Sequence, residues 1–141
     1  MKVFNIGDKT EYGQIQLQIA KSQNKFGAMY YFEKIQLSST SPIADYNTWR
    51  SKDGQNYLCI RHEPSLKAEL DKIVETIMQC SDLKFKETDV AQIFFKIRPD
   101  LADSIPRNKN INVVLRIFGV FQQKNADLAY LQMEVIEVIS C

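Results

Sequence analysis

Hydrophobic and polar positions alternate with a period of two over much of the chain, which predicts a β-rich fold. Residues 14–21 alternate isoleucine or leucine with glutamine, a pattern typical of a strand with one buried face. Residues 28–37 and 55–62 also have strand composition. The two longest apolar runs, 111–121 and 128–139, flank the polar stretch QQKNAD. They predict a long closing hairpin.

The period changes after residue 62 and predicts one helix. Pro64 suits a helix start, and the Ser65 side chain could cap the first free amides. Apolar side chains then recur at helical spacing at Leu66, Leu70, Ile73, Val74, Ile77 and Met78. We expect this stripe to pack against a sheet. A short strand over residues 91–97 and a proline-containing loop over residues 99–110 then lead to the closing hairpin.

The order of these elements suggests a particular fold. A helix between the third strand and a closing hairpin is the order of the five-stranded OB barrel, which binds ligands on strands 2 and 3 beneath its 1–2 and 4–5 loops. We therefore predict one mainly β domain over residues 1–141: a five-stranded OB-like β-barrel with one α-helix between strands 3 and 4 and a short extra strand. Residues 22–27 and 122–127 would form the two ligand loops.

Composition narrows the functional classes. The 141 residues are 45% hydrophobic, as in an ordinary globular domain. Residues 1–62 have eight Lys or Arg against five Asp or Glu, whereas residues 63–91 have four against seven. The predicted helix is thus acidic and the strands are mildly basic, which hints at a basic face.

We also expect an intracellular protein with no membrane partner, in the host cytoplasm or nucleus if it is viral. No apolar run approaches the ~18 residues of a membrane span. The N-terminus has no apolar signal-peptide core. The odd count of three cysteines favours reduced thiols over a disulfide framework.

Motifs for catalysis are absent from the sequence. It contains one histidine and no P-loop, GxGxxG or HExxH pattern. Cys59 and His62 could share a metal, but no second ligand pair accompanies them. A nuclease or hydrolase that uses Asp100, Asp103 or Glu134 with a metal is one hypothesis. We instead predict a protein that is not an enzyme and has no metal site and no cofactor.

Aromatic and cationic side chains on alternate strand positions and in loops predict a binding surface. Single-stranded nucleic acid needs rings for base stacking and cations for phosphates. Phe26, on the short 1–2 loop, would be a ligand finger. A single ring in a strand belongs to the core more often than not, and one bulge reverses the face of every following residue. The candidate residues are Lys25, Phe26, Tyr30, Phe32, Lys34, Trp49, Tyr57, Arg61, Arg107, Lys109, Arg116, Phe118, Lys124 and Tyr130.

Three segments, SKDGQNYLCIR (51–61), NINVVLRIFGVF (110–121) and AYLQMEVIEV (129–138), carry a resemblance. Their strand composition resembles that of single-stranded DNA-binding proteins with an OB fold from phages and large DNA viruses. The resemblance implies sequence-independent binding of exposed strands in DNA replication, recombination or repair. The residues that match by position are Tyr57, Arg61, Arg116, Phe118 and Tyr130. Many such proteins end in an acidic tail, whereas this chain ends in VIEVISC.

Two functions therefore remain open besides the metal-dependent one. The first is non-catalytic binding of single-stranded DNA, or RNA, by base stacking and phosphate neutralisation. The alternative is a protein–protein interaction or assembly module that uses the same aromatic-rich face, because aromatics and arginine are also enriched in such interfaces. A homo-oligomer would be one form of this alternative.

Overall fold

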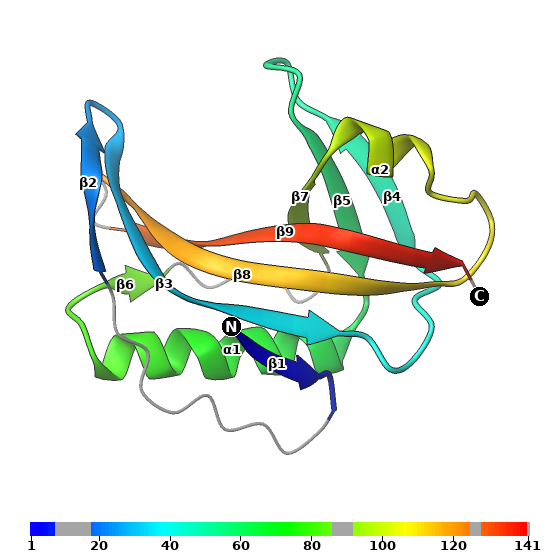
Figure 1. Ribbon diagram of the computed structural model, residues 1–141, viewed down its shortest axis with the longest axis horizontal. Helices are drawn as coiled ribbons and strands as arrows, with labels where there is room; N and C mark the ends of the chain where they lie inside the picture. Colours follow the sequence, from blue (N-terminus) through cyan, green and yellow to red (C-terminus); the bar gives the residue numbers. More distant parts are fainter. Residues whose placement is uncertain (8–17, 86–91, 125–127, 141) are drawn as a thin grey trace.

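The structure, a computed structural model, describes residues 1–7, 18–85, 92–124 and 128–140 and is mainly β (Figure 1). Residues 14–17 and 91 of the predicted strands and residues 125–127 of the predicted 4–5 loop lie outside the described residues. In chain order the elements are β1 (Lys2–Asn5), β2 (Gln18–Asn24), β3 (Gly27–Ser38), β4 (Tyr46–Arg50), β5 (Asn56–Arg61), α1 (Pro64–Gln79), β6 (Lys84–Phe85), β7 (Gln92–Ile97), α2 (Pro99–Asp103), β8 (Ile111–Gln123) and β9 (Leu128–Ser140).

The strands form one open sheet in the order β1-β3-β8-β9-β7-β5-β4, with β2 also paired to β3 and β6 also paired to β9. The predicted five-stranded barrel is therefore wrong. A barrel requires its first and last strands to pair. Here β5 pairs on one side with β7 and on the other with β4, a strand that the sequence analysis did not predict. The path through the described strands thus ends at β4 and does not close.

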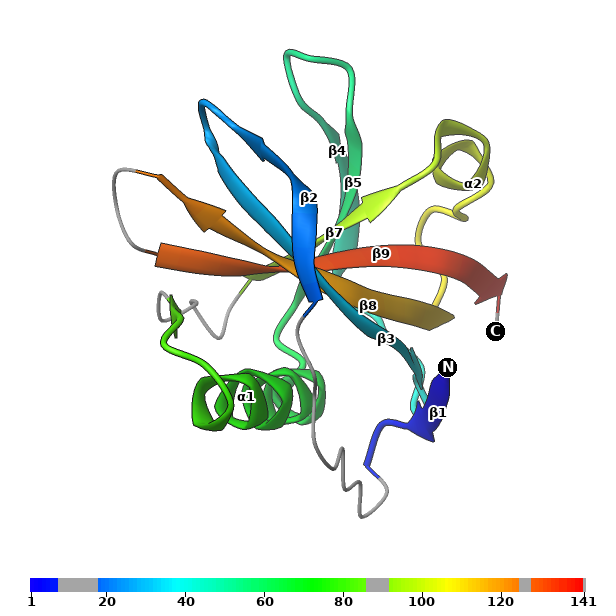
Figure 2. The same cartoon turned by 60° about the vertical axis from the view of Figure 1, so that its left-hand side comes forward.

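The predicted helix and closing hairpin are confirmed. Helix α1 follows β5 and lies along one face of the sheet (Figures 1 and 2). Its stripe is buried at Leu66, Leu70, Ile73 and Ile77, whereas Met78 is exposed. Ser65 is not the cap, because the N-cap position is Glu63 and no side-chain capping bond forms there. Burial of the stripe therefore stabilises this helix more than capping does.

The sheet has two faces that we name for their relation to α1. The helix face packs against α1 and contains the fully buried side chains of Leu58, Phe95, Leu115 and Ile117. The outer face is opposite. The strand register places one row of neighbouring residues across it: Gln36, Arg116, Glu134, Lys96, Tyr57 and Trp49.

A register shift in β3 corrects the predicted faces of two rings. The pairing with β8 is interrupted between Tyr31 and Ile35, and Phe32 and Ile35 are both buried. Tyr30 and Phe32 therefore belong to the helix face, although the sequence analysis expected both on the binding face. Phe32 is only 7% exposed, and Tyr30 is half-buried against the core. Tyr31 is on the outer face in their place.

Strands β4 and β5 form a hairpin around a turn that contains the turn-favouring dipeptide Asp53–Gly54. The Gly54 N–H donates to the Ser51 carbonyl oxygen at 3.0 Å, and the Ser51 N–H donates to the Gln55 carbonyl oxygen at 2.9 Å. Gly54 has a φ of +86°, a conformation that glycine adopts without steric cost. The tips of this hairpin and of the β2–β3 hairpin both point away from α1 (Figures 1 and 2).

Candidate nucleic-acid interface

Three aromatic rings gather on the outer face and form what we call the ring cluster: Trp49, Tyr57 and Phe94. The centroids of Trp49 and Tyr57 are 5.4 Å apart with their planes tilted by 36°. The Trp49 and Phe94 rings meet edge to face at 6.2 Å. Trp49 is 52% exposed and Phe94 is 45% exposed. The cluster therefore presents ring surface to solvent.

Strand pairing explains how the ring cluster forms. Trp49 on β4 is directly opposite Tyr57 on β5, and Phe94 on β7 is opposite Cys59 on β5. The Trp49 ring must therefore reach across β5 to contact Phe94, and Cys59 lies between these rings with 3% exposure. Burial raises the pKa of the Cys59 thiol; the nearby Arg61 guanidinium lowers it and Asp45 adds to the rise.

A small hollow adjoins the rings. It has a volume of about 200 Å³ and is lined by Asn47, Trp49, Cys59, Arg61, Gln92 and Phe94. Its wall combines two aromatic rings, two amides and a guanidinium. Stacking surfaces and donors for a base edge or a phosphate thus lie side by side.

The cations beside the ring cluster differ in how they are paired. Arg61 Nε is 3.0 Å from Asp45 Oδ1, and His62 Nε2 is 3.6 Å from the other oxygen of that carboxylate. Lys96, directly opposite Tyr57, is exposed and donates to the amide oxygen of Gln132 at 3.3 Å. A phosphate would therefore displace only a neutral amide at Lys96, whereas at Arg61 it would compete with a carboxylate.

The predicted phosphate contact at Arg116 has an internal partner. Its guanidinium forms an ion pair with Glu134, the residue opposite it on β9, and both side chains are half-buried. A phosphate at this position would meet a charge that is already neutralised. Arg116 as it stands is therefore a weaker phosphate contact than the sequence analysis expected.

A second group of candidate residues meets at the β2–β3 tip, which we call the hairpin tip. Phe26 is 66% exposed, and Lys25 Nζ is 5.0 Å above its ring. The Lys124 N–H, at the end of β8, donates to the Phe26 carbonyl oxygen at 3.1 Å. The two predicted ligand loops are thus in contact, although the barrel that would place them over strands 2 and 3 is absent.

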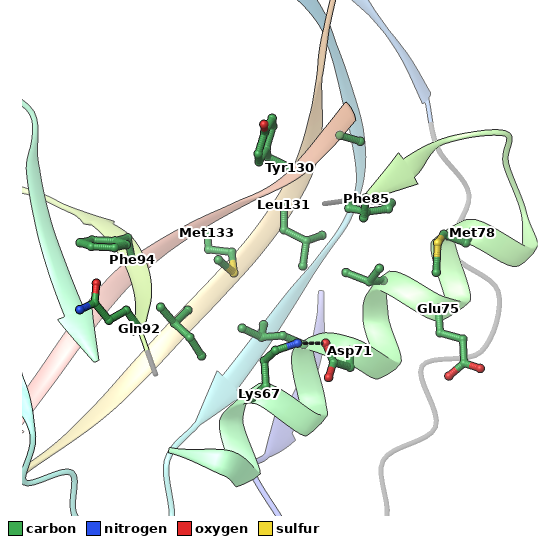
Figure 3. Close-up of a pocket in the computed structure, with 14 residues that line it drawn as sticks. Lys67, Asp71, Glu75, Met78, Phe85, Gln92, Phe94, Tyr130, Leu131 and Met133 are labelled. Carbon is green, nitrogen blue, oxygen red and sulfur yellow. Dashed lines mark hydrogen bonds and ion pairs between the residues drawn. The ribbon is translucent and has the colours of Figure 1, made fainter. Parts of the chain in front are cut away.

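The remaining candidates are dispersed. Arg107 and Lys109 are exposed on the loop between α2 and β8, where the Lys109 carbonyl oxygen accepts a hydrogen bond from Tyr46 Oη. Lys34 is exposed at the interrupted part of β3, and Phe118 is half-buried at a register shift in β8. Tyr130 is half-buried and points away from α1 (Figure 3).

The sequence analysis missed two residues of the ring cluster region, Phe94 and Lys96. The sequence does indicate that both side chains point outward, because they alternate in β7 with the buried Ile93, Phe95 and Ile97. The predicted short strand was treated as an addition to a barrel, so no outward face was assigned to it. Its pairing with β5, which is remote in sequence, places both side chains beside Tyr57 and Trp49.

A second cavity, of about 790 Å³, lies between α1 and strands β6, β7 and β9. Figure 3 shows Leu131 and Met133 pointing toward α1 and Tyr130 on the other side of β9. The ion pair between Lys67 and Asp71 lies at its helical wall. Gln92, Phe94 and Tyr130 also line this cavity, so its rim adjoins the outer face beside the ring cluster.

Over the described ranges, no three His, Cys, Asp or Glu side chains gather as a metal site would require. No helix of the described chain is long and apolar enough to cross a membrane. No protein-family model, curated protein or solved structure matches the chain.

Proposed function

We propose that this protein binds single-stranded DNA on its outer face, without catalysis and largely without sequence preference, in replication, recombination or repair. The observation that supports this most strongly is the ring cluster, in which Trp49 and Phe94 are exposed beside Lys96. Every base has an aromatic face, so stacking on such rings is tolerant of sequence, and cations neutralise the backbone. The resemblance to phage and viral single-stranded DNA-binding proteins agrees with this proposal.

The outer face offers a continuous route for a strand away from the ring cluster. Lys96 on β7 donates to Gln132 on β9, and Tyr130 is two residues further along the same face. Tyr130 is opposite Phe121 on β8, which in turn is opposite Met29 on β3. A strand on this route would cross the sheet from the ring cluster toward the hairpin tip and meet further aromatic side chains.

Intrinsic fluorescence gives a direct test, because Trp49 is the only tryptophan. Stacking of a base on Trp49 should quench its emission during titration with oligothymidylate. The affinity should fall as salt rises, with a slope of log K against log salt of about −0.7 per phosphate neutralised. Phe94→Ala removes one stacking surface worth about 1–3 kcal/mol, so the dissociation constant should rise about 5- to 150-fold.

Matched variants separate the two parts of the route. Met78 on α1 has 44% exposure, close to that of Phe94, and Met78→Ala should leave oligonucleotide binding unchanged. Phe26→Ala tests the hairpin tip. If this variant loses affinity only for longer oligonucleotides, the binding site extends from the ring cluster to the hairpin tip. If wild type and Phe94→Ala bind the oligonucleotide with equal affinity, the ring cluster is not part of the interface. Competition by oligouridylate of equal length measures the preference for DNA over RNA.

One observation favours the alternative function, a protein–protein interaction module. Trp49 contacts both of the other rings, and the three form a compact apolar patch, as in the cores of interfaces. A protein without oligonucleotide binding at low salt, whose Phe94→Ala variant loses a protein partner or self-association, would support this alternative over strand binding.

A further inference from the structure

We propose that two copies of this chain join through the edge of β4 and form one continuous sheet. This inference does not depend on nucleic-acid binding. Strand β4 is the last strand of the sheet, and its residues from Asn47 to Arg50 are exposed. A terminal strand offers unpaired N–H and C=O groups as a template for another strand.

The hydrogen-bond register identifies which groups of β4 are unpaired. The Ser51 N–H donates to the carbonyl of Gln55, and the Arg61 N–H donates to the carbonyl of Asp45. In an antiparallel pair the hydrogen-bonded positions alternate, so odd-numbered residues of β4 bond to β5. The backbone groups of Tyr46, Thr48 and Arg50 therefore point away from the sheet. Within the described chain, no backbone bond beyond those of the strand ladders involves them.

The side chains at these three positions complement each other when the β4 strands of two copies pair. An antiparallel pair of β4 strands about a two-fold axis at Thr48 places Thr48 opposite Thr48 of the second copy. Tyr46 is then opposite Arg50, and this pairing occurs twice. A guanidinium beside an aromatic ring is attractive, and no like charges face each other across the pair. A two-fold interface requires such self-complementarity, and two-fold dimers are the commonest homo-oligomers.

The same geometry makes the second copy extend the outer face. In this pairing both sheets present the same face on one side, with Asn47 opposite Trp49 of the second copy. The two ring clusters then adjoin, and Trp49 loses part of its exposure. A single five-residue strand pair buries little area, so we expect a weak dimer with a Kd on the order of micromolar or above.

Charge substitution at Thr48 tests the two-fold axis directly. Sedimentation equilibrium of the full chain should show the mass rising from 16.3 kDa toward twice that value with concentration. Thr48→Lys and Thr48→Glu each place like charges opposite one another. Each variant alone should dissociate at a concentration up to about fivefold higher than wild type. An equimolar mixture of the two should restore the dimer, because the introduced ammonium of one copy would then face the introduced carboxylate of the other.

Controls keep the outcome decisive. Thr48→Val keeps the strand-forming side chain and the backbone edge, so it should dimerise as wild type does, and circular dichroism should show all variants folded. A wild type that is monomeric at every concentration overturns the proposal. So does a dimer that resists both charged variants, or a mixture that fails to recover, since either result places the interface away from Thr48.

Discussion

Substitution of Arg116 and substitution of Glu134, which form an ion pair, should change the affinity for single-stranded DNA in opposite directions. The pair is in the middle of the outer face, in the same cross-strand row as Lys96 and Tyr57. Glu134→Gln keeps the size of the side chain and frees the Arg116 guanidinium to contact a phosphate. Single-stranded DNA should therefore bind more tightly to Glu134→Gln than to wild type. Arg116→Gln should bind it more weakly, because an unpaired Glu134 carboxylate repels the strand.

The expected magnitude follows from counterion release. One additional neutralised phosphate changes the slope of log K against log salt by about 0.7 for a single strand. Relative to 1 M salt, where this contribution vanishes, the gain at 0.1 M is about fivefold in affinity. The cost to the fold is small, because an ion pair that retains solvent contact contributes up to about 1 kcal/mol.

The assay is the Trp49 quenching titration with oligothymidylate at several salt concentrations, together with urea unfolding of each variant. A steeper salt slope and tighter binding for Glu134→Gln would support phosphate contact at this row. Equal losses of affinity in both variants would contradict the reasoning, since the pair would then act only by holding β8 and β9 in position. Unchanged binding in both would place the strand elsewhere.

Three further predictions concern the fold and its ionisable groups. Gly119→Ala should destabilise the protein by about 1–3 kcal/mol in urea unfolding, because a Cβ there would be 2.6 Å from the Tyr30 carbonyl oxygen. Iodoacetamide at pH 8 should label the exposed Cys80 well before Cys59, as read by peptide mass mapping, because burial raises the pKa of Cys59 and restricts access to it. Burial also raises the pKa of Glu63 in the folded protein, so the folded state binds this proton more tightly than the unfolded chain. Stability should then fall as pH rises from the unfolded value of about 4.3 through the raised pKa, and Glu63→Gln should remove this dependence of the urea midpoint.

Local periodicity was sufficient to predict the elements whose partners are close in sequence. The stripe of α1 and the β8–β9 hairpin follow from spacing alone, because a helix satisfies its own backbone and a hairpin pairs adjacent segments. The Asp53–Gly54 turn was readable for the same reason. The Arg116–Glu134 pair was also within reach, since both residues belong to the predicted closing hairpin and have the same strand parity as its exposed candidates.

Pairing between remote segments was not predictable from these patterns. Nothing local indicates that β5 pairs with β7 rather than with the neighbours required by a barrel. Strand β4 has few aliphatic residues because it is an exposed edge, so its pattern resembles that of a loop. The shift in β3 reverses the faces of Tyr30 and Phe32, and no alternation rule reveals where such a shift occurs.

The same limits explain the outcome at the binding face. Trp49 and Tyr57 had been proposed as candidates and are in contact, because both belong to one hairpin. Phe94 was missed because its strand had no assigned neighbours. The hairpin tip was recovered only in part, since its two loops meet through the β3–β8 pairing and not through a closed barrel.

The parallel ladder between β7 and β9 contains only two residue pairs, Lys96 with Glu134 and Ile97 with Val135. The ring cluster is attached on one side of this short joint, and the hairpin tip is attached on the other. If the sheet bends at this joint, the distance between the ring cluster and the hairpin tip changes. The number of nucleotides needed to span the outer face therefore depends on this angle, and backbone amides at the joint should exchange with deuterium sooner than those in the middle of β8.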